Sequence, residues 1–169
     1  MALRFGDLNT LISPELNPDS KILMVRNIVD RLAMVAPFLH ADGDPYLALI
    51  GGRAVWIVDL YSTTDRYPYS QPAIDGRLNF DSPLPRDFNY IRNSVKAVVD
   101  AEHGSMDLYV LEGADPLTRA YQQIFPEVFT DFPAMTDELR EHLRYPEDMF
   151  RVQSDMYATY HQIDPEDFF

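Results

Sequence analysis

Apolar residues recur along this chain with two different spacings, which separate helical segments from strands. Between Asp19 and Ala36 the apolar positions follow one another at three- and four-residue intervals, from Ile22 to Val35. This spacing predicts an amphipathic helix with one buried face. Pro37 follows directly, and the residue before a proline disfavours helical geometry, so the helix should end at Ala36.

Two short apolar segments, 46–50 and 53–61, flank the pair Gly51-Gly52. Two glycines in succession accept the positive φ angles of a tight hairpin turn, so residues 46–61 are predicted to form a β-hairpin. Apolar residues occupy both sets of alternating positions in this hairpin. Both of its faces should therefore be covered, with Trp56 largely buried.

A second hairpin is predicted over residues 94–111, with its turn at residues 102–105. Val95, Ala97 and Val99 alternate onto one face, whereas Lys96 and Asp100 lie on the other. Alternation of this kind is typical of a strand with only one covered face. The first helix is expected to pack over the face that carries the apolar residues.

The last third of the chain is predicted to be helical. Helices should begin near Asp115-Pro116, at Thr136 and at Pro146, since each position combines a capping residue or a proline with a following apolar pattern. The fold class is therefore α+β. We expect one antiparallel sheet built from the two hairpins, helices packed on it and a helical C-terminal third.

Residues 62–89 show neither helical nor strand periodicity, and they are rich in proline and tyrosine. Long loops without periodicity are uncommon in compact domains unless they are functional or follow a partner surface. We predict that three aromatic anchors hold this loop against the sheet: Tyr61, Tyr67 and Tyr69. The candidate binding surface is then formed by the remaining polar residues: Asp65, Arg66, Ser70 and Gln71.

The aspartates on or near this loop have two interpretations. Asp59, Asp65, Asp75 and Asp81, with tyrosines between them, could form a carbohydrate or peptide groove or a weak calcium site. They could equally cap turns, which is the commoner role of aspartate in loops.

The charge balance limits the possible partners. With 14 basic and 27 acidic residues the net charge is −13, and such a surface repels phosphate backbones and anionic headgroups. Nucleic acid is therefore excluded as a partner. No apolar run approaches the roughly 20 residues of a membrane-spanning helix, so this segment should not insert into a membrane.

The search for catalytic and metal-binding motifs is negative. There is no cysteine, the four histidines are widely separated, and the sequence contains no nucleophile elbow, phosphate-binding glycine loop or dinucleotide fingerprint. We predict no metal site and no cofactor, and the catalytic residues, if any, remain unknown.

Several stretches resemble Uncharacterised Protein Family 0182, a family of large bacterial integral-membrane proteins. They occur in family order over nearly the whole chain. The stretches are residues 3–9 (LRFGDLN), 36–39 (APFL), 54–71 (AVWIVDLYSTTDRYPYSQ), 90–101 (YIRNSVKAVVDA) and 142–153 (HLRYPEDMFRVQ).

The resemblance implies a location and partners. Members of this family resemble multi-pass membrane proteins with a large domain facing away from the cytoplasm. Residues 1–169 would be a single soluble domain, a fragment of such a protein on the extracytoplasmic side of the bacterial plasma membrane. Transmembrane helices outside this chain would anchor it. Its expected partners are the rest of the parent membrane protein or another envelope protein.

Three functions remain open at this point. The first is an extracytoplasmic structural or interaction domain. The second is a small-ligand or calcium-binding envelope module that uses residues 62–89. The third is an envelope hydrolase or transferase without a recognisable motif. Because no catalytic motif is present, the sequence favours a binding domain over an enzyme.

Overall fold

The computed structural model describes residues 25–73, 78, 82–85 and 87–161. Their centre is a six-stranded sheet in the order β1-β3-β4-β5-β6, in which β2 also pairs with β3. The strands are β1 (His40–Ala41), β2 (Tyr46–Ile50), β3 (Arg53–Thr64), β4 (Tyr90–Asp100), β5 (Met106–Val110) and β6 (Phe129–Asp131).

Both predicted hairpins are present and share this sheet, so the α+β fold class is confirmed. β2 pairs with β3 around Gly51 and Gly52, whose φ angles are +56° and +77°, and β4 pairs with β5. The long strands β3 and β4 join the two hairpins in antiparallel register. The sheet is not wholly antiparallel, however, because β6 pairs with β5 in parallel. Three residues are too few for a periodicity signal, so the sequence did not indicate β6.

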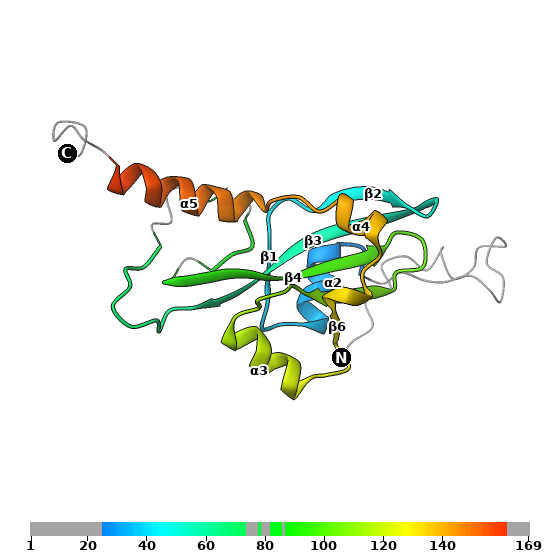
Figure 1. Cartoon of the computed structure of the whole chain (residues 1–169), viewed down its shortest axis with the longest axis horizontal. Coiled ribbons are helices and arrows are strands. Elements are labelled where there is room, and N and C mark those ends of the chain that lie inside the picture. The colour runs from blue at the N-terminus through cyan, green and yellow to red at the C-terminus, as the bar shows by residue number, and fades with distance from the viewer. Residues whose placement is uncertain (1–24, 74–77, 79–81, 86, 162–169) are drawn as a thin grey trace, which may run out of the picture.

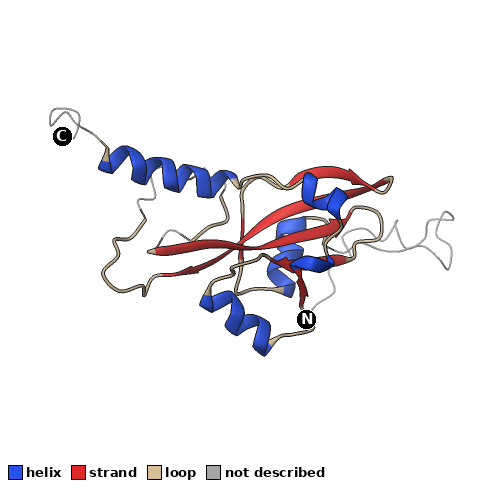
Figure 2. Ribbon diagram, viewed as in Figure 1, coloured by secondary structure: helices blue, strands red, loops and turns tan. Residues whose placement is uncertain are grey.

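Four α-helices flank the sheet in the described part of the chain, and Figures 1 and 2 show them on both sides of the strands. In Figure 1, α5 lies above the long strands and α3 lies below them, whereas α4 lies next to β2 and α2 overlaps β4 in this view. The helices are α2 (Ile28–Val35), α3 (Pro116–Ile124), α4 (Asp137–Glu141) and α5 (Glu147–Tyr160), with a 3-10 turn at Phe132–Ala134. The three predicted C-terminal helices are thus confirmed.

The first helix is shorter than the apolar spacing predicted. It begins after Asn27, whose side chain accepts hydrogen bonds from Val29 N and Asp30 N at 2.8 and 3.3 Å. Residues 25–27 are not helical, so no continuous helix runs from residue 19 to residue 36, and residues 19–24 lie outside the described part. A strong N-cap at Asn27 outweighs the apolar pattern before it.

The largest apolar cluster lies between α2 and the sheet, as predicted. It contains Leu32 and Ala36 of the helical segment together with Val95, Ala97 and Val99 of β4, all at most 2% exposed. Trp56, expected to be largely buried, is partly buried and packs against this cluster.

The opposite face of β4 is also covered, contrary to the prediction. Val98 packs with Met135 and Leu139 near α4, and Lys96 and Asp100 are only 4% and 8% exposed. The alternation of charged and apolar residues on β4 therefore reflects paired buried charges and not a solvated face.

Both faces of β3 are covered, but this holds only in part for β2. Val58 and Leu60 pack in the cluster under α2, whereas Val55 and Ile57 pack in the opposite cluster. Alternate β2 side chains point outward, with Leu47 and Leu49 at 52% and 67% exposed.

Candidate functional site

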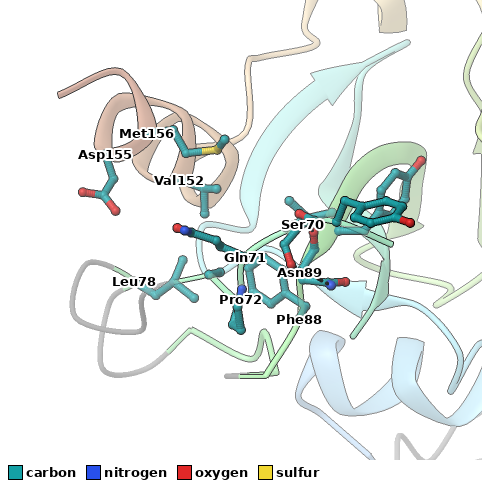
Figure 3. Close-up of a pocket in the computed structure, with 13 residues that line it drawn as sticks. Ser70, Gln71, Pro72, Leu78, Phe88, Asn89, Val152, Asp155 and Met156 are labelled. Atoms are coloured by element: carbon teal, nitrogen blue, oxygen red, sulfur yellow. Dashed lines mark hydrogen bonds between the residues drawn. The ribbon is translucent and has the colours of Figure 1, made fainter. Parts of the chain in front are cut away.

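A cavity of about 510 Å³ lies between α5, the loop residues 69–73 and residues 88–91, which lead into β4. We call it the α5 groove. Figure 3 shows Val152 and Met156 on the α5 side and Ser70, Gln71 and Phe88 on the side of the loops. Leu78 and Phe88 belong to a third apolar cluster, separate from the two that cover the faces of the sheet. Their side chains give the groove an apolar floor. A cavity of this size, mainly apolar with a few polar groups, is typical of a binding site.

Asn89 fixes the shape of the loop side. Its Oδ1 accepts a hydrogen bond from Tyr67 N at 2.9 Å, and its Nδ2 donates to Tyr67 O at 2.9 Å. Ser70 Oγ donates to Asn89 O at 2.9 Å, and Ala73 N donates to Phe88 O at 2.8 Å. The two loop segments are therefore tied to each other. The sequence does not indicate this role of Asn89, because an asparagine at a strand end gives no signal of a partner 22 residues away.

The three predicted loop anchors differ in their environments. Tyr61 is fully buried but belongs to β3, which extends to Thr64, so residues 62–64 are strand and not loop. Tyr67 is 52% exposed and stacks on Tyr90 with ring centroids 5.2 Å apart.

Tyr69 does not anchor the loop: its side chain is fully exposed, at 109%. Its φ of +58° is the only positive value at a non-glycine residue in the described part of the chain. A tyrosine in this region costs energy that no packing of its own ring offsets, and such strain tends to occur at functional sites. It stands at the rim of the α5 groove.

The predicted binding surface is divided by the structure. Ser70 and Gln71 line the α5 groove, whereas Asp65 and Arg66 do not. Asp65 and Arg66 lie on the exposed loop, where Asp65 Oδ1 and Arg66 Nε are 3.7 Å apart. An exposed ion pair of this kind contributes little to stability.

Helix α5 has apolar side chains on two faces. Met149 and Val152 pack inward, next to Tyr61 and Phe88. Outside, Phe150, Met156 and Tyr157 are 62%, 56% and 65% exposed. We call these three residues the α5 stripe. Phe150 and Tyr157 are seven residues apart and share the outward face, whereas Met156, four residues after Val152, lies at the α5 groove.

A cluster of buried polar side chains fixes the start of α5. Tyr61 donates its hydroxyl proton to Asp42, and Asp148 N donates to Asp42 Oδ2 at 3.0 Å. Asp148 Oδ2 in turn accepts from Ser82 Oγ and Gly43 N, at 2.7 and 3.1 Å. Burial raises the pKa of Asp148 and also that of Tyr61, so the tyrosine stays a hydrogen-bond donor. The Asp42-Gly43-Asp44 sequence therefore serves to position α5.

Asp59, weighed above with the loop carboxylates, is buried in the sheet and pairs with Lys96 of β4. Lys96 Nζ also donates to Arg144 O at 3.0 Å. Burial raises the pKa of Asp59, and the nearby Lys96 ammonium opposes that shift only in part. Asp75 and Asp81, the other loop carboxylates considered for a groove or a calcium site, lie outside the described residues.

Within the described part of the chain, no three histidine or carboxylate side chains are grouped so that they could hold a metal ion. None of the helices there is both long enough and apolar enough for a membrane span.

The comparison with known proteins identifies the family. The uncharacterised protein family UPF0182 matches residues 1–169, that is, the whole chain. The chain belongs to UPF0182. It is 48% identical over 169 residues to a UPF0182 protein of Synechococcus sp. (strain JA-3-3Ab), and 42% identical over 168 residues to one of Methanospirillum hungatei JF-1. Each alignment covers 99% of this chain. No solved structure matches it.

The UPF0182 relatives are much longer than this chain. The chain spans 19% of the Synechococcus protein and 18% of the Methanospirillum protein. The names of these relatives give neither a substrate nor a partner, so the α5 groove and the α5 stripe are the features that bear on function.

Proposed function

We propose that this UPF0182 chain is a structural and interaction domain of a longer membrane-anchored protein, on the extracytoplasmic side of the plasma membrane. The observation that carries the proposal is the α5 stripe, exposed beside the α5 groove and its strained, fully exposed Tyr69. Large apolar side chains exposed together on one helix, next to an apolar groove, favour an interaction site. The occupant that we infer is another segment of the same polypeptide.

The lengths of the relatives support this occupant. In the relatives about four fifths of the polypeptide lie outside the matched segment, because the alignments cover 18–19% of them. A segment linked covalently to this domain avoids most of the entropy cost of association. Covering the three side chains of the α5 stripe is worth a few kcal/mol, on the order of 1–2 kcal/mol each, since they are already partly buried. This is enough to hold a linked segment in place.

The membrane location rests on the resemblance of this chain to large integral-membrane proteins. We place the membrane anchor in segments outside this chain, which leaves this domain as the part that docks. Its strong negative charge, −13, would keep it away from anionic headgroups and favour contacts with protein surfaces.

Methionine oxidation offers an internal test of docking. Met156 in the α5 stripe is 56% exposed and Met34 on α2 is 63% exposed, so both should react similarly with hydrogen peroxide in the isolated chain. In the full-length polypeptide we expect protection of Met156, with Met34 still oxidised, as measured by peptide mass spectrometry. Equal oxidation of the two methionines in the purified full-length protein would contradict intramolecular docking. Protection of Met156 only in whole cells would instead indicate a separate envelope protein and would also overturn the proposal.

A small apolar ligand is the second candidate, because a groove of about 510 Å³ lies within the usual range for small-molecule sites. This alternative predicts that a ligand released by denaturing the purified protein can be detected by mass spectrometry. It also predicts that Phe150, which does not line the groove, stays accessible to hydroxyl-radical labelling in the full-length polypeptide.

A further inference from the structure

A second cavity, of about 410 Å³, lies along the first half of β4. Its other walls are the connection from β5 to α3, residues 111–114, and the chain around the start of α5, residues 144–153. It shares Ile91 with the α5 groove but otherwise has its own walls. We call it the cationic cavity because Arg92, Lys96 and Arg144 line it.

The strand that borders this cavity has an open edge. β4 pairs with β3 from Tyr90 to Asp100, with one register shift that leaves Ser94 without a partner in β3. On its other edge, however, β5 pairs with it only over residues 95–99, and one further bond joins Leu111 N to Ser94 O at 2.8 Å. Residues 90–93 therefore have no strand partner on this edge within the described part of the chain. An unpaired strand edge is a ready template for an added strand.

The charges around the cavity are unusual for so acidic a protein. Arg92, Lys96 and Arg144 line it, and Glu112 is the only acidic residue among the described residues of its lining. Lys96 is neutralised by Asp59, whereas none of the ion pairs between described residues involves Arg92 or Arg144. In a chain with 27 acidic and 14 basic residues, two unpaired arginines at one cavity favour an anionic occupant.

Arg144 is held in place by two contacts. Lys96 Nζ donates to its carbonyl oxygen at 3.0 Å, and its guanidinium lies over the Tyr46 ring, 4.4 Å from the centroid. Stacking on one face leaves the N–H groups at the edge of a guanidinium free to bind a carboxylate in a bidentate manner. The cavity thus combines a fixed cation with an open strand edge.

We propose that the cationic cavity binds an extended peptide segment with acidic side chains, which adds to β4 beside residues 90–93. Its backbone pairs with the open edge, and its carboxylates bind Arg92 and Arg144. Side chains of an added strand alternate in direction, so every second residue of the segment meets the arginines. This site does not depend on the docking proposed for the α5 stripe.

The probe is a short peptide of alternating valine and glutamate, with an alternating valine–lysine peptide as the control of opposite charge. We expect chemical-shift changes at residues 90–96 and 111–114 with the glutamate peptide only. Hydrogen exchange at residues 90–93 should slow when it binds. The double change Arg92→Glu and Arg144→Glu should weaken binding at least about tenfold, since both carboxylate contacts become repulsive.

Arg66→Glu is the matched control variant, because Arg66 is exposed and does not line either cavity. It should bind the glutamate peptide as the unaltered chain does. If the double variant melts early, the single change Arg92→Gln gives the same test at an exposed position. Unchanged affinity in the folded arginine variants would overturn the proposal. So would equal shifts with free glutamate and no slowing of exchange, which would indicate a site for small anions and not a strand.

Discussion

Asp115 gathers donors from three separate elements around one buried carboxylate. Its Oδ2 accepts hydroxyl protons from Ser62 of β3, Ser94 of β4 and Thr118 of α3, at 2.7, 2.7 and 2.8 Å. Its Oδ1 caps α3 by accepting from Leu117 N at 2.9 Å. Burial alone would raise the pKa of Asp115, but the hydrogen bonds outweigh burial and lower it. The side chain thus stays ionised and ties α3 to the sheet.

Changing Asp115 to Asn should destabilise the fold by about 2 kcal/mol at neutral pH, because an amide has one acceptor oxygen for several buried donors. The pKa of Asp115 in the folded chain lies below its ordinary value of 3.8, so its contribution is present above that pH and lost as the pH falls further. The difference between the two proteins in urea unfolding should therefore shrink from about pH 7 to about pH 3. Asp107→Asn, at an exposed position of β5, should unfold like the original. A difference that grew in acid would contradict this account.

The residues that the sequence could not place are mostly buried polar ones. Lys96 looked solvent-facing because it alternates with valines, yet its partner Asp59 is 37 residues away. The spacing of residues along the chain cannot show such a pair. Burying a charge is costly unless an opposite charge lies beside it, and here only the fold brings that partner near. Tyr69 was misjudged for the opposite reason, because aromatic residues usually bury large areas.

Helix α5 illustrates what can be predicted at the scale of an element. Pro146 and the acidic residues after it correctly indicated its start, because they suit a helix N-terminus. The donors at that end are satisfied by tertiary contacts, however: Asp148 N donates to Asp42 Oδ2, and Met149 N donates to the Tyr61 hydroxyl at 3.2 Å. These acceptors lie about a hundred residues earlier, so no local pattern could reveal them.

Neighbouring residues of α5 should respond very differently to alanine. Met149→Ala should cost about 2–4 kcal/mol of unfolding free energy, because Met149 is 7% exposed in the cluster with Tyr61. Phe150→Ala should cost less than about 0.5 kcal/mol in the isolated chain, since Phe150 is 62% exposed. Chemical unfolding of the two variants gives both values. A large loss with Phe150→Ala would mean that the α5 stripe is already packed within this chain.

At the scale of the whole molecule, the fold class followed from periodicity but the candidate site did not. Hairpins and helices are local, and their apolar spacings indicated most of them. The α5 groove instead combines residues 69–73, residues 88–91 and α5, and the cationic cavity depends on where β5 stops pairing with β4. Neither depends on one local motif, so only the three-dimensional structure could reveal them.

The proposed location of the domain can be tested because the chain has no cysteine. In a cysteine-free full-length polypeptide, Arg66→Cys would introduce one thiol at a side chain that is 90% exposed. We expect a membrane-impermeant maleimide to label it in intact cells whose outer layers are permeable to the reagent, because the domain faces away from the cytoplasm. Ile57→Cys, at a fully buried position, should react only after denaturation and controls for reagent access to the folded domain. Labelling of the Arg66→Cys protein only after the cells are lysed would place the domain in the cytoplasm and refute the proposed location.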